Sequence, residues 1–203
     1  MRSTTRFLLA VSLLASSVAL AQSHVRLSYE FAVPRGDTKD YIDRFSSRGG
    51  HLDVSLELSY AFHLELSAGL NSFNGGKQGV LTTTDGQDVS GKQFRYLNAI
   101  PLMGGFAFHI PLRHGGRIWA GVNGGAAYFD RVIDLGLNSY SRSDWQWGVQ
   151  PHVGIACGLG DGGTALFFDA RWQYFWERHG IPSQQYFSFG VGLLFGGSPQ
   201  KRK

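Results

Sequence analysis

The chain has 203 residues, a formal net charge of +4 and a single cysteine, Cys157. Two arginines lie in the first six residues and three basic residues end the chain, so 14 of the 19 Lys and Arg remain to face 15 Asp and Glu. This near-neutral body argues against a nucleic-acid partner, and one cysteine excludes an internal disulfide. No segment reaches the roughly 18 consecutive apolar residues of a transmembrane helix.

The N-terminus has the parts of a secretory signal peptide. Arg2 and Arg6 flank a polar start, the apolar run FLLAVSLLA follows, and Ala19-Leu20-Ala21 ends it. This run is too short to cross a bilayer as a helix, which disfavours the alternative of an uncleaved anchor. We predict three parts: a cleaved signal peptide at 1–21, one domain at 22–195 and a basic extension at 196–203.

Eight segments of the remaining chain have strand character, because they are rich in β-branched and aromatic residues and most of them alternate. In the stretch GHLDVSLELSYAF, the apolar residues from Leu52 to Phe62 share one face, whereas Asp53 and Glu57 share the other. The chain also has 28 glycines and no helical periodicity, which argues against helices. The predicted strands are 24–33, 51–62, 64–74, 92–108, 117–129, 145–159, 164–176 and 185–195.

The connections between these strands alternate in length. Those at 34–50, 75–91 and 130–144 are long, polar and rich in glycine, whereas those around 63, at 109–116 and at 160–163 are short. In an up-and-down meander, all long connections then meet at one end and all short ones at the other. Long loops at one end and tight turns at the other are typical of outer-membrane barrels.

A soluble lipocalin-like barrel is the structural alternative, in which the apolar faces would line a cavity instead of meeting lipid. The aromatic residues favour lipid, because they gather near strand ends on the apolar faces, as interfacial girdles do. These residues are Tyr60, Phe62, Trp145, Trp147, Trp172, Tyr174 and Trp176. The pattern therefore predicts an all-β, eight-stranded antiparallel transmembrane barrel.

The polar faces of the strands would line the lumen of this barrel. The alternation turns five acids and three arginines inward: Arg26, Glu30, Asp53, Glu57, Glu65, Arg95, Asp169 and Arg171. An eight-stranded barrel is only wide enough for side chains to fill, and an unpaired buried charge is costly. We therefore expect an ion-paired plug, and an ion pathway is the alternative.

Three segments resemble known barrel motifs. The last strand, QYFSFGVGLLF, resembles the C-terminal signal by which outer-membrane barrels reach the insertion machinery, although GGSPQKRK follows it. The residues of this signal are Phe187, Phe189, Val191, Leu193 and Phe195. FRYLNAIPLM (94–103) resembles the Y-L-x-I-P-L stretch of PorT-like barrels with one extra residue, which suggests a bulge at Pro101. DARWQY (169–174) resembles the acid-x-Arg-aromatic pattern that is common in late strands of the same barrels.

Taken together, the chain is similar to the eight-stranded OmpA/OmpX/OmpW-type family over its whole mature length. This resemblance implies a bacterial outer-membrane location and a non-enzymatic role that is structural, adhesive or part of an envelope assembly. The partners it implies are outer-membrane lipid, the insertion machinery and envelope proteins that contact the long loops or the C-terminal tail. A narrow pore or carrier for a small solute remains an alternative role.

The sequence shows no phosphate loop, nucleophile elbow or metal-spaced cysteine and histidine set, so we expect no cofactor, no metal and no catalytic residue. The histidines are expected in the lumen (His51, His152), at short turns (His63, His109, His114) and in a loop (His179). A lipid A-modifying enzyme is the third alternative. Its candidate residues are His179, Ser183 and Glu177, but catalysis needs base, nucleophile and acid within hydrogen-bond reach.

Overall fold

The computed structural model describes residues 23–82, 88–112, 116–136, 138–160 and 163–196. The predicted signal peptide and most of the basic extension lie outside these residues. The elements are β1 (Ser23–Arg35), α2 (Gly36–Tyr41), β2 (Ser46–Glu57), β3 (Phe62–Thr82), β4 (Asp88–Pro111), β5 (Arg117–Leu135), β6 (Asn138–Gly158), β7 (Thr164–Phe175) and β8 (Gln184–Phe195).

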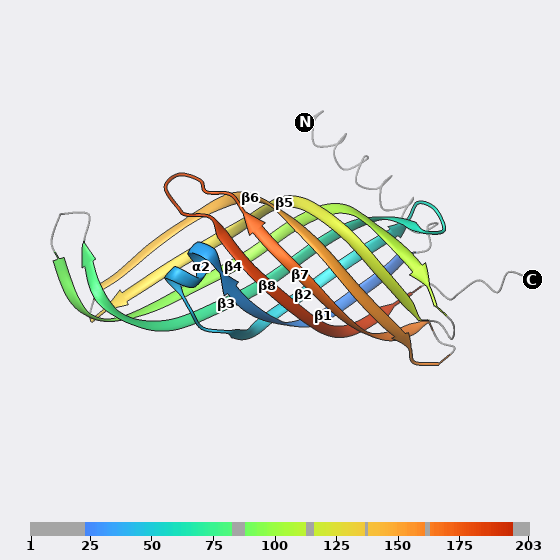
Figure 1. Ribbon diagram of the computed structural model, residues 1–203, viewed down its shortest axis with the longest axis horizontal. Coiled ribbons are helices and arrows are strands. Elements are labelled where there is room, and N and C mark those ends of the chain that lie inside the picture. The colour runs from blue at the N-terminus through green and yellow to red at the C-terminus, as the bar shows by residue number, and fades with distance from the viewer. Residues whose placement is uncertain (1–22, 83–87, 113–115, 137, 161–162, 197–203) are drawn as a thin grey trace, which may run out of the picture.

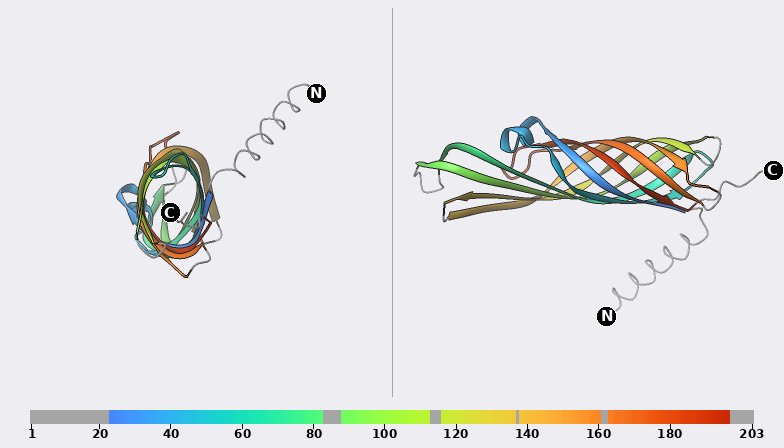
Figure 2. Two further views of the ribbon diagram at one scale, coloured as in Figure 1. Left: turned by 90° about the vertical axis from the view of Figure 1, so that its right-hand side faces the viewer. Right: turned by 90° about the horizontal axis from the view of Figure 1, so that it is seen from below.

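The eight strands form a closed barrel in sequence order, in which every neighbouring pair is antiparallel (Figures 1 and 2). Pairing of β1 with β8, from Val25 opposite Phe195 to Arg35 opposite Gln185, closes the ring. The predicted fold class is therefore confirmed. Closure leaves no sheet edge unpaired in the body of the barrel, which is a requirement for a sheet that crosses lipid. No helix among the described residues is long and apolar enough to cross a membrane.

The two ends of the barrel differ as the connection lengths predict. β1 begins and β8 ends at the end with tight connections, and α2 lies toward the opposite end (Figure 1). Beyond α2, the ribbons β3–β4 and β5–β6 project together from the barrel (Figure 2). In outer-membrane barrels, the end with the longer connections faces outward from the cell. The projecting ribbons are therefore extracellular.

The predicted long loops 75–91 and 130–144 are largely wrong, because the strands continue through them. Pairing of β3 with β4 persists to Thr82 opposite Asp88, and pairing of β5 with β6 persists to Leu135 opposite Asn138. Outside the membrane neither face of a ribbon must be apolar, so the alternation that reveals a strand disappears while the backbone ladder continues.

The predicted turn around residue 63 is also wrong. The turn lies at 58–61, where Leu58 N donates to Phe62 O (2.9 Å) and Phe62 N donates to Ser59 O (3.2 Å). The segment Ser59–Ala61 continues the polar–apolar alternation and has no glycine or proline, so periodicity did not reveal it. His63 consequently lies in β3 rather than in a turn.

The bulge predicted at Pro101 is not observed. The β3–β4 register is the same on both sides, with Ala68 opposite Leu102 and Asn71 opposite Ala99. Pro101 pairs with Ala127 of β5, so the missing proline N–H is accommodated without an extra residue. A register shift does occur between β1 and β2, at Glu30/Ala32.

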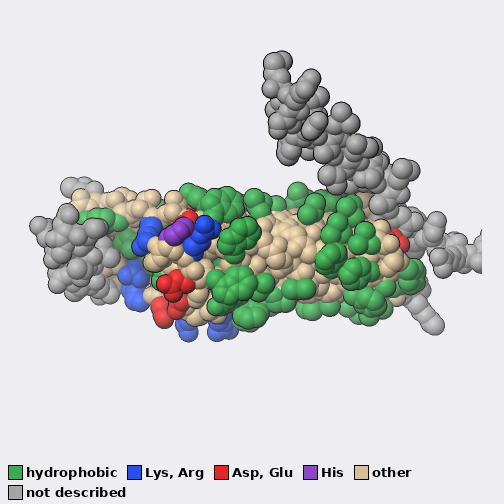
Figure 3. Space-filling model, turned by 90° about the horizontal axis from the view of Figure 1, so that it is seen from above, with side chains coloured by type: hydrophobic (Ala, Val, Ile, Leu, Met, Phe, Trp, Pro, Cys, Tyr) green, Lys and Arg blue, Asp and Glu red, His purple; other side chains and the backbone are tan. Residues whose placement is uncertain are grey.

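The outer wall is a belt of exposed apolar side chains, and Figure 3 shows charged side chains gathered mainly toward the ribbon end. Members of the belt from six strands are Leu27, Leu66, Phe106, Val122, Val153 and Phe168, each 47–57% exposed. Soluble monomers rarely expose contiguous apolar surface on this scale. The belt is the lipid-facing surface of a membrane barrel, so the lipocalin-like alternative is wrong.

Candidate functional site

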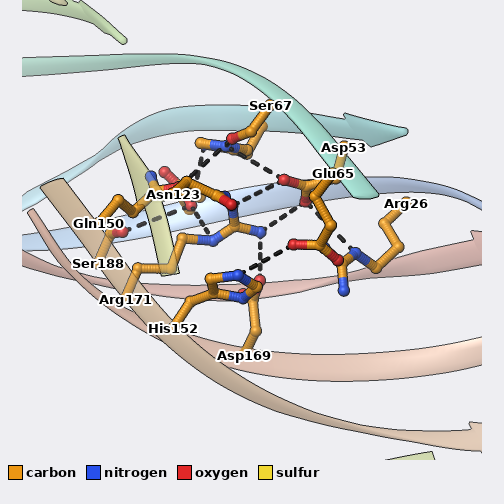
Figure 4. A network of polar contacts seen from close by, with 12 residues as sticks. Arg26, Asp53, Glu65, Ser67, Asn123, Gln150, His152, Asp169, Arg171 and Ser188 are labelled. Atoms are coloured by element: carbon orange, nitrogen blue, oxygen red, sulfur yellow. Dashed lines mark hydrogen bonds and ion pairs between the residues drawn. The ribbon is translucent and has the colours of Figure 1, made fainter. Parts of the chain in front are cut away.

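Six of the eight predicted lumen charges lie together in one buried layer across the middle of the barrel (Figure 4). They are Arg26, Glu30, Asp53, Glu65, Asp169 and Arg171, each at most 5% exposed. The pleat of the strands explains why these side chains point into the lumen. The residues immediately before and after each charge are apolar and point outward, to the belt. The layer is called the charge layer below.

Arg171 is at the centre of this layer. Its Nη1 and Nη2 donate to Asp53 Oδ1 (3.0 Å) and Oδ2 (2.7 Å), and Nη2 also donates to Asp169. Its Nε lies 3.3 Å from Glu30 Oε1, and Asn71 Nδ2 donates to Glu30 Oε2 (2.9 Å). β7 and β2 are not neighbours in the sheet, so the bidentate Arg171–Asp53 pair crosses the lumen.

Arg26 makes a second transverse pair. Its Nη2 donates to Glu65 Oε1 (2.8 Å), its Nε lies 3.5 Å from Asp53 Oδ2, and its guanidinium lies over Trp119, 4.7 Å from the ring centroid. Because β1 and β3 are separated by β2, this pair also crosses the lumen. Asp53 links the two arginines, so the layer is one network rather than separate pairs.

Two histidines extend the network, as the sequence predicts for the lumen. His51 Nε2 lies 2.5 Å from Ser67 Oγ and its Nδ1 lies 3.4 Å from Glu30 Oε1. His152 Nε2 lies 3.0 Å from Glu65 Oε2. Both rings are buried, and each supplies a polar partner to a carboxylate that an arginine already neutralises.

Three further histidines line the lumen near the tight-turn end. His63 and His109 are buried with ring centroids 4.0 Å apart, and His24 stacks on His63 at 5.5 Å. The expected turn positions of His63 and His109 are wrong, because their strands extend further than the sequence suggests. His114 lies outside the described residues. Within the described part of the chain, no group of His, Cys, Asp and Glu is arranged to hold a metal ion.

Apolar clusters fill the lumen on both sides of the charge layer. On the extracellular side, Phe73, Leu97, Phe129, Phe175 and Tyr186 belong to one fully buried cluster. On the other side, Trp119, Phe167 and Leu194 belong to a second. Among the described residues, the lumen thus contains an apolar layer, a charge layer and another apolar layer, and the charges of the central layer are buried.

The other two predicted lumen charges do not join the charge layer. Glu57 is only half-buried, at the last position of β2 beside the tight turn. Arg95 lies on β4 above the apolar cluster, where Nη1 donates to the carbonyl of Tyr41 (3.2 Å) and Nη2 donates to Gln93 Oε1 (2.6 Å). Their inward direction was predicted from alternation, but their height along the barrel was not.

Arg95 belongs instead to a second constellation, at the extracellular end, which we call the cup. The cup comprises Tyr41, Lys77, Arg95, Arg131 and Arg142, contributed by α2 and by β3, β4, β5 and β6. Tyr41 is buried, and its hydroxyl donates to Val132 O (3.0 Å). The guanidiniums of Arg131 and Arg95 lie 3.9 and 5.2 Å from its ring centroid.

Three of the four cations of the cup, Lys77, Arg95 and Arg142, donate hydrogen bonds to neutral oxygens. Lys77 Nζ donates to Asp40 O (2.9 Å), and Arg142 Nη2 donates to His179 O. Arg131, the cross-strand partner of Arg142, lies with its guanidinium over the Tyr41 ring. Burial raises the pKa of the Tyr41 phenol, so this group stays neutral. None of the four cations forms an ion pair with a carboxylate of the described residues.

The residues of the enzymatic alternative have separate partners. His179 Nδ1 lies 2.5 Å from Asp144 Oδ2, and Ser183 Oγ donates to Asp37 Oδ2 (2.6 Å). A nucleophile must bond to its base, and here the hydroxyl and the imidazole each face a different carboxylate. Within the described part of the chain, Glu177 forms no hydrogen bond or ion pair with His179 or Ser183.

No protein-family model and no curated protein match this sequence. Among solved structures, the chain is similar to Ail, the attachment invasion locus protein of Yersinia pestis, in complex with the heparin analogue sucrose octasulfate. The TM-score is 0.50 at 13% identity, over 85% of this chain and 97% of Ail. It is also similar to Neisserial surface protein A (NspA), with a TM-score of 0.56 at 9% identity over 87% of this chain and 98% of NspA. Because the identities are low, the likeness shows the fold alone: this chain is an eight-stranded outer-membrane β-barrel similar to Ail and NspA.

Proposed function

We propose that this protein is a non-conducting, non-enzymatic surface protein of the outer membrane that binds an anionic partner, such as an acidic polysaccharide, in its extracellular cup. The observation that carries the proposal is the set of three arginines and one lysine on four consecutive strands of the extracellular ribbons, none of which forms an ion pair with a carboxylate of the described residues. Arginine forks match sulfate, phosphate and carboxylate geometry, so a polyanion would supply the missing counter-charge.

Two further observations support this role. Tyr41 fixes the arginines before any ligand arrives, because its ring lies under Arg95 and Arg131 while its hydroxyl is bonded to β5. Preorganised groups lose less entropy on binding. Ail, which has the same fold, has been crystallised with a heparin analogue, and this makes an anionic ligand reasonable for a barrel of this architecture.

The lumen favours surface binding over transport. The two transverse ion pairs and the apolar clusters above and below them occupy the centre of the barrel. A pore would need a continuous polar path, and conduction also requires weak, multiple binding of the ion along it. The acid–imidazole pair Asp144–His179 lacks a bonded hydroxyl, so the lipid-modifying alternative has no nucleophile in place.

Binding of dextran sulfate and of uncharged dextran to the barrel in lipid nanodiscs tests the proposal. We expect dextran sulfate alone to bind, with an affinity that falls as salt screens the charges. In the triple variant Arg95→Gln, Arg131→Gln, Arg142→Gln, the affinity for dextran sulfate should fall by about tenfold or more. Loss of a single charge-assisted hydrogen bond would already account for about tenfold. Arg35→Gln, which removes an arginine that lies over Phe187 on the outer wall, is the matched control. Equal binding by the triple variant and wild type would contradict the proposal.

A further inference from the structure

The lipid-facing wall contains an open groove of about 660 Å³ over β1, β2 and β3. Its sides are the exposed side chains of Leu27, Tyr29 and Leu70, and its floor includes Gly50 and Ala68. Gly50 faces the belt between its cross-strand partners Tyr29 and Leu70, so the absence of a side chain there opens the groove. A Cβ at Gly50 would meet only Ser28 O, at 3.7 Å, which is an ordinary van der Waals contact. A larger residue could therefore stand at this position without displacing the backbone.

This groove continues down the wall. A second hollow of about 400 Å³ shares Leu52 and Ala68 with the first and reaches Gly104 on β4. Gly104 pairs with Leu66, which pairs with Val54. The groove therefore extends along β2 from Arg48 at its outer end to Val54, a distance of six residue steps. At about 3.3 Å per residue and a strand tilt of about 45°, this is roughly 14 Å along the membrane normal. The groove therefore spans about one leaflet of a hydrocarbon core of about 30 Å.

Arg48 gives the groove a charged end. It is exposed at the extracellular rim, next to Tyr29, whose hydroxyl donates to Ser47 O in the interfacial region. The guanidinium of Arg48 has no hydrogen bond or ion pair within the described part of the chain. A cation at the headgroup level above an apolar groove favours a lipid with net negative charge on its phosphate over an uncharged lipid, or over a zwitterionic one whose own cation balances the phosphate.

From this arrangement we infer that the groove holds one acyl chain of an anionic outer-leaflet lipid, whose phosphate is bound by Arg48. The occupant is a membrane lipid because the groove opens onto the belt and ends where a leaflet ends. This site is separate from the cup, which opens to the extracellular medium on the inner side of the ribbons. It does not rest on the proposed function, so either one can fail alone.

Native mass spectrometry of the barrel, released from micelles with equal amounts of phosphatidylglycerol and phosphatidylcholine, tests the inference. Wild type should retain one phosphatidylglycerol per barrel. Arg48→Gln should reduce this retention by about tenfold, as for loss of a charge-assisted pair. Gly50→Leu, which fills the groove and leaves the charge, should reduce the retention of both lipids.

Two controls keep the result specific. Arg35→Gln removes an arginine outside the groove, and Ala170→Leu places the same leucine side chain on the belt at β7. Both should retain phosphatidylglycerol as wild type does. Equal retention of the two lipids by wild type, or unchanged retention in Arg48→Gln, would overturn the inference. A dimer that Gly50→Leu abolishes would assign the groove to a second copy of the chain and overturn it as well.

Discussion

Arg171 on β7 and Asp53 on β2 are joined across the lumen by two parallel hydrogen bonds of 3.0 and 2.7 Å. The same guanidinium also contacts Asp169 and Glu30, so one cation is shared by three buried carboxylates. Such a pair is costly to break from one side, because the carboxylates stay buried without their counter-charge.

Arg171→Ala should therefore lower the free energy of unfolding by about 3–5 kcal/mol, the range for removal of one partner of a buried pair. Urea unfolding in lipid vesicles measures this change. Arg178→Ala, which removes a partly exposed arginine bonded to a backbone carbonyl at the rim, is the control and should cost less than about 1 kcal/mol. A loss as small as that of the control would mean that water solvates the lumen charges.

The belt makes a second prediction, about depth. Leu66 is midway along the belt on β3, whereas Leu56 is one residue from the end of β2. Leu66→Arg should destabilise the barrel by about 2–4 kcal/mol and Leu56→Arg by about 0–1, because the cost of a lipid-facing arginine falls toward the interface. The same unfolding assay checks both variants. Equal penalties would show that the membrane is placed wrongly on the barrel.

Tyr41 makes a third prediction, about the ribbons. Its side chain ties α2 to β5 through Val132 and lies under two arginines. Tyr41→Ala should free both ribbons locally and increase the rate of trypsin cleavage after Lys77 or Arg131, because proteolysis follows local opening. Tyr140→Ala, at an exposed position on the β6 ribbon, is the control. Cleavage that is unchanged in Tyr41→Ala would show that the ribbons hold together without it.

The sequence predicted the direction of side chains much better than their height or partners. Alternation fixes the face of each residue, so Asp53, Glu65 and Arg171 could be placed in the lumen from local pattern alone. Which of them meet depends on the stagger of the closed barrel, and no local pattern encodes it. For the same reason Arg95 was grouped with the charge layer although it lies in the cup.

The histidine stack and the ribbons were missed for related reasons. His63 and His109 were placed in turns because the strand ends were set by alternation, which continues through the 58–61 turn and fades beyond the membrane. Tyr41 could not be recognised at all, because it is the last residue of a six-residue helix in a polar connection and its partners come from β4 and β5. Only their cross-barrel contacts reveal these residues.

The most direct test of the sealed barrel is a planar-bilayer recording of the wild-type protein. The charge layer lies between two apolar clusters, so we predict no steady current at any moderate voltage, for wild type and for Arg171→Ala alike. The layer holds four carboxylates and two arginines, so a water-filled lumen would instead favour cations. A steady cation-selective current in the wild type would contradict the sealed lumen and make the protein a narrow pore.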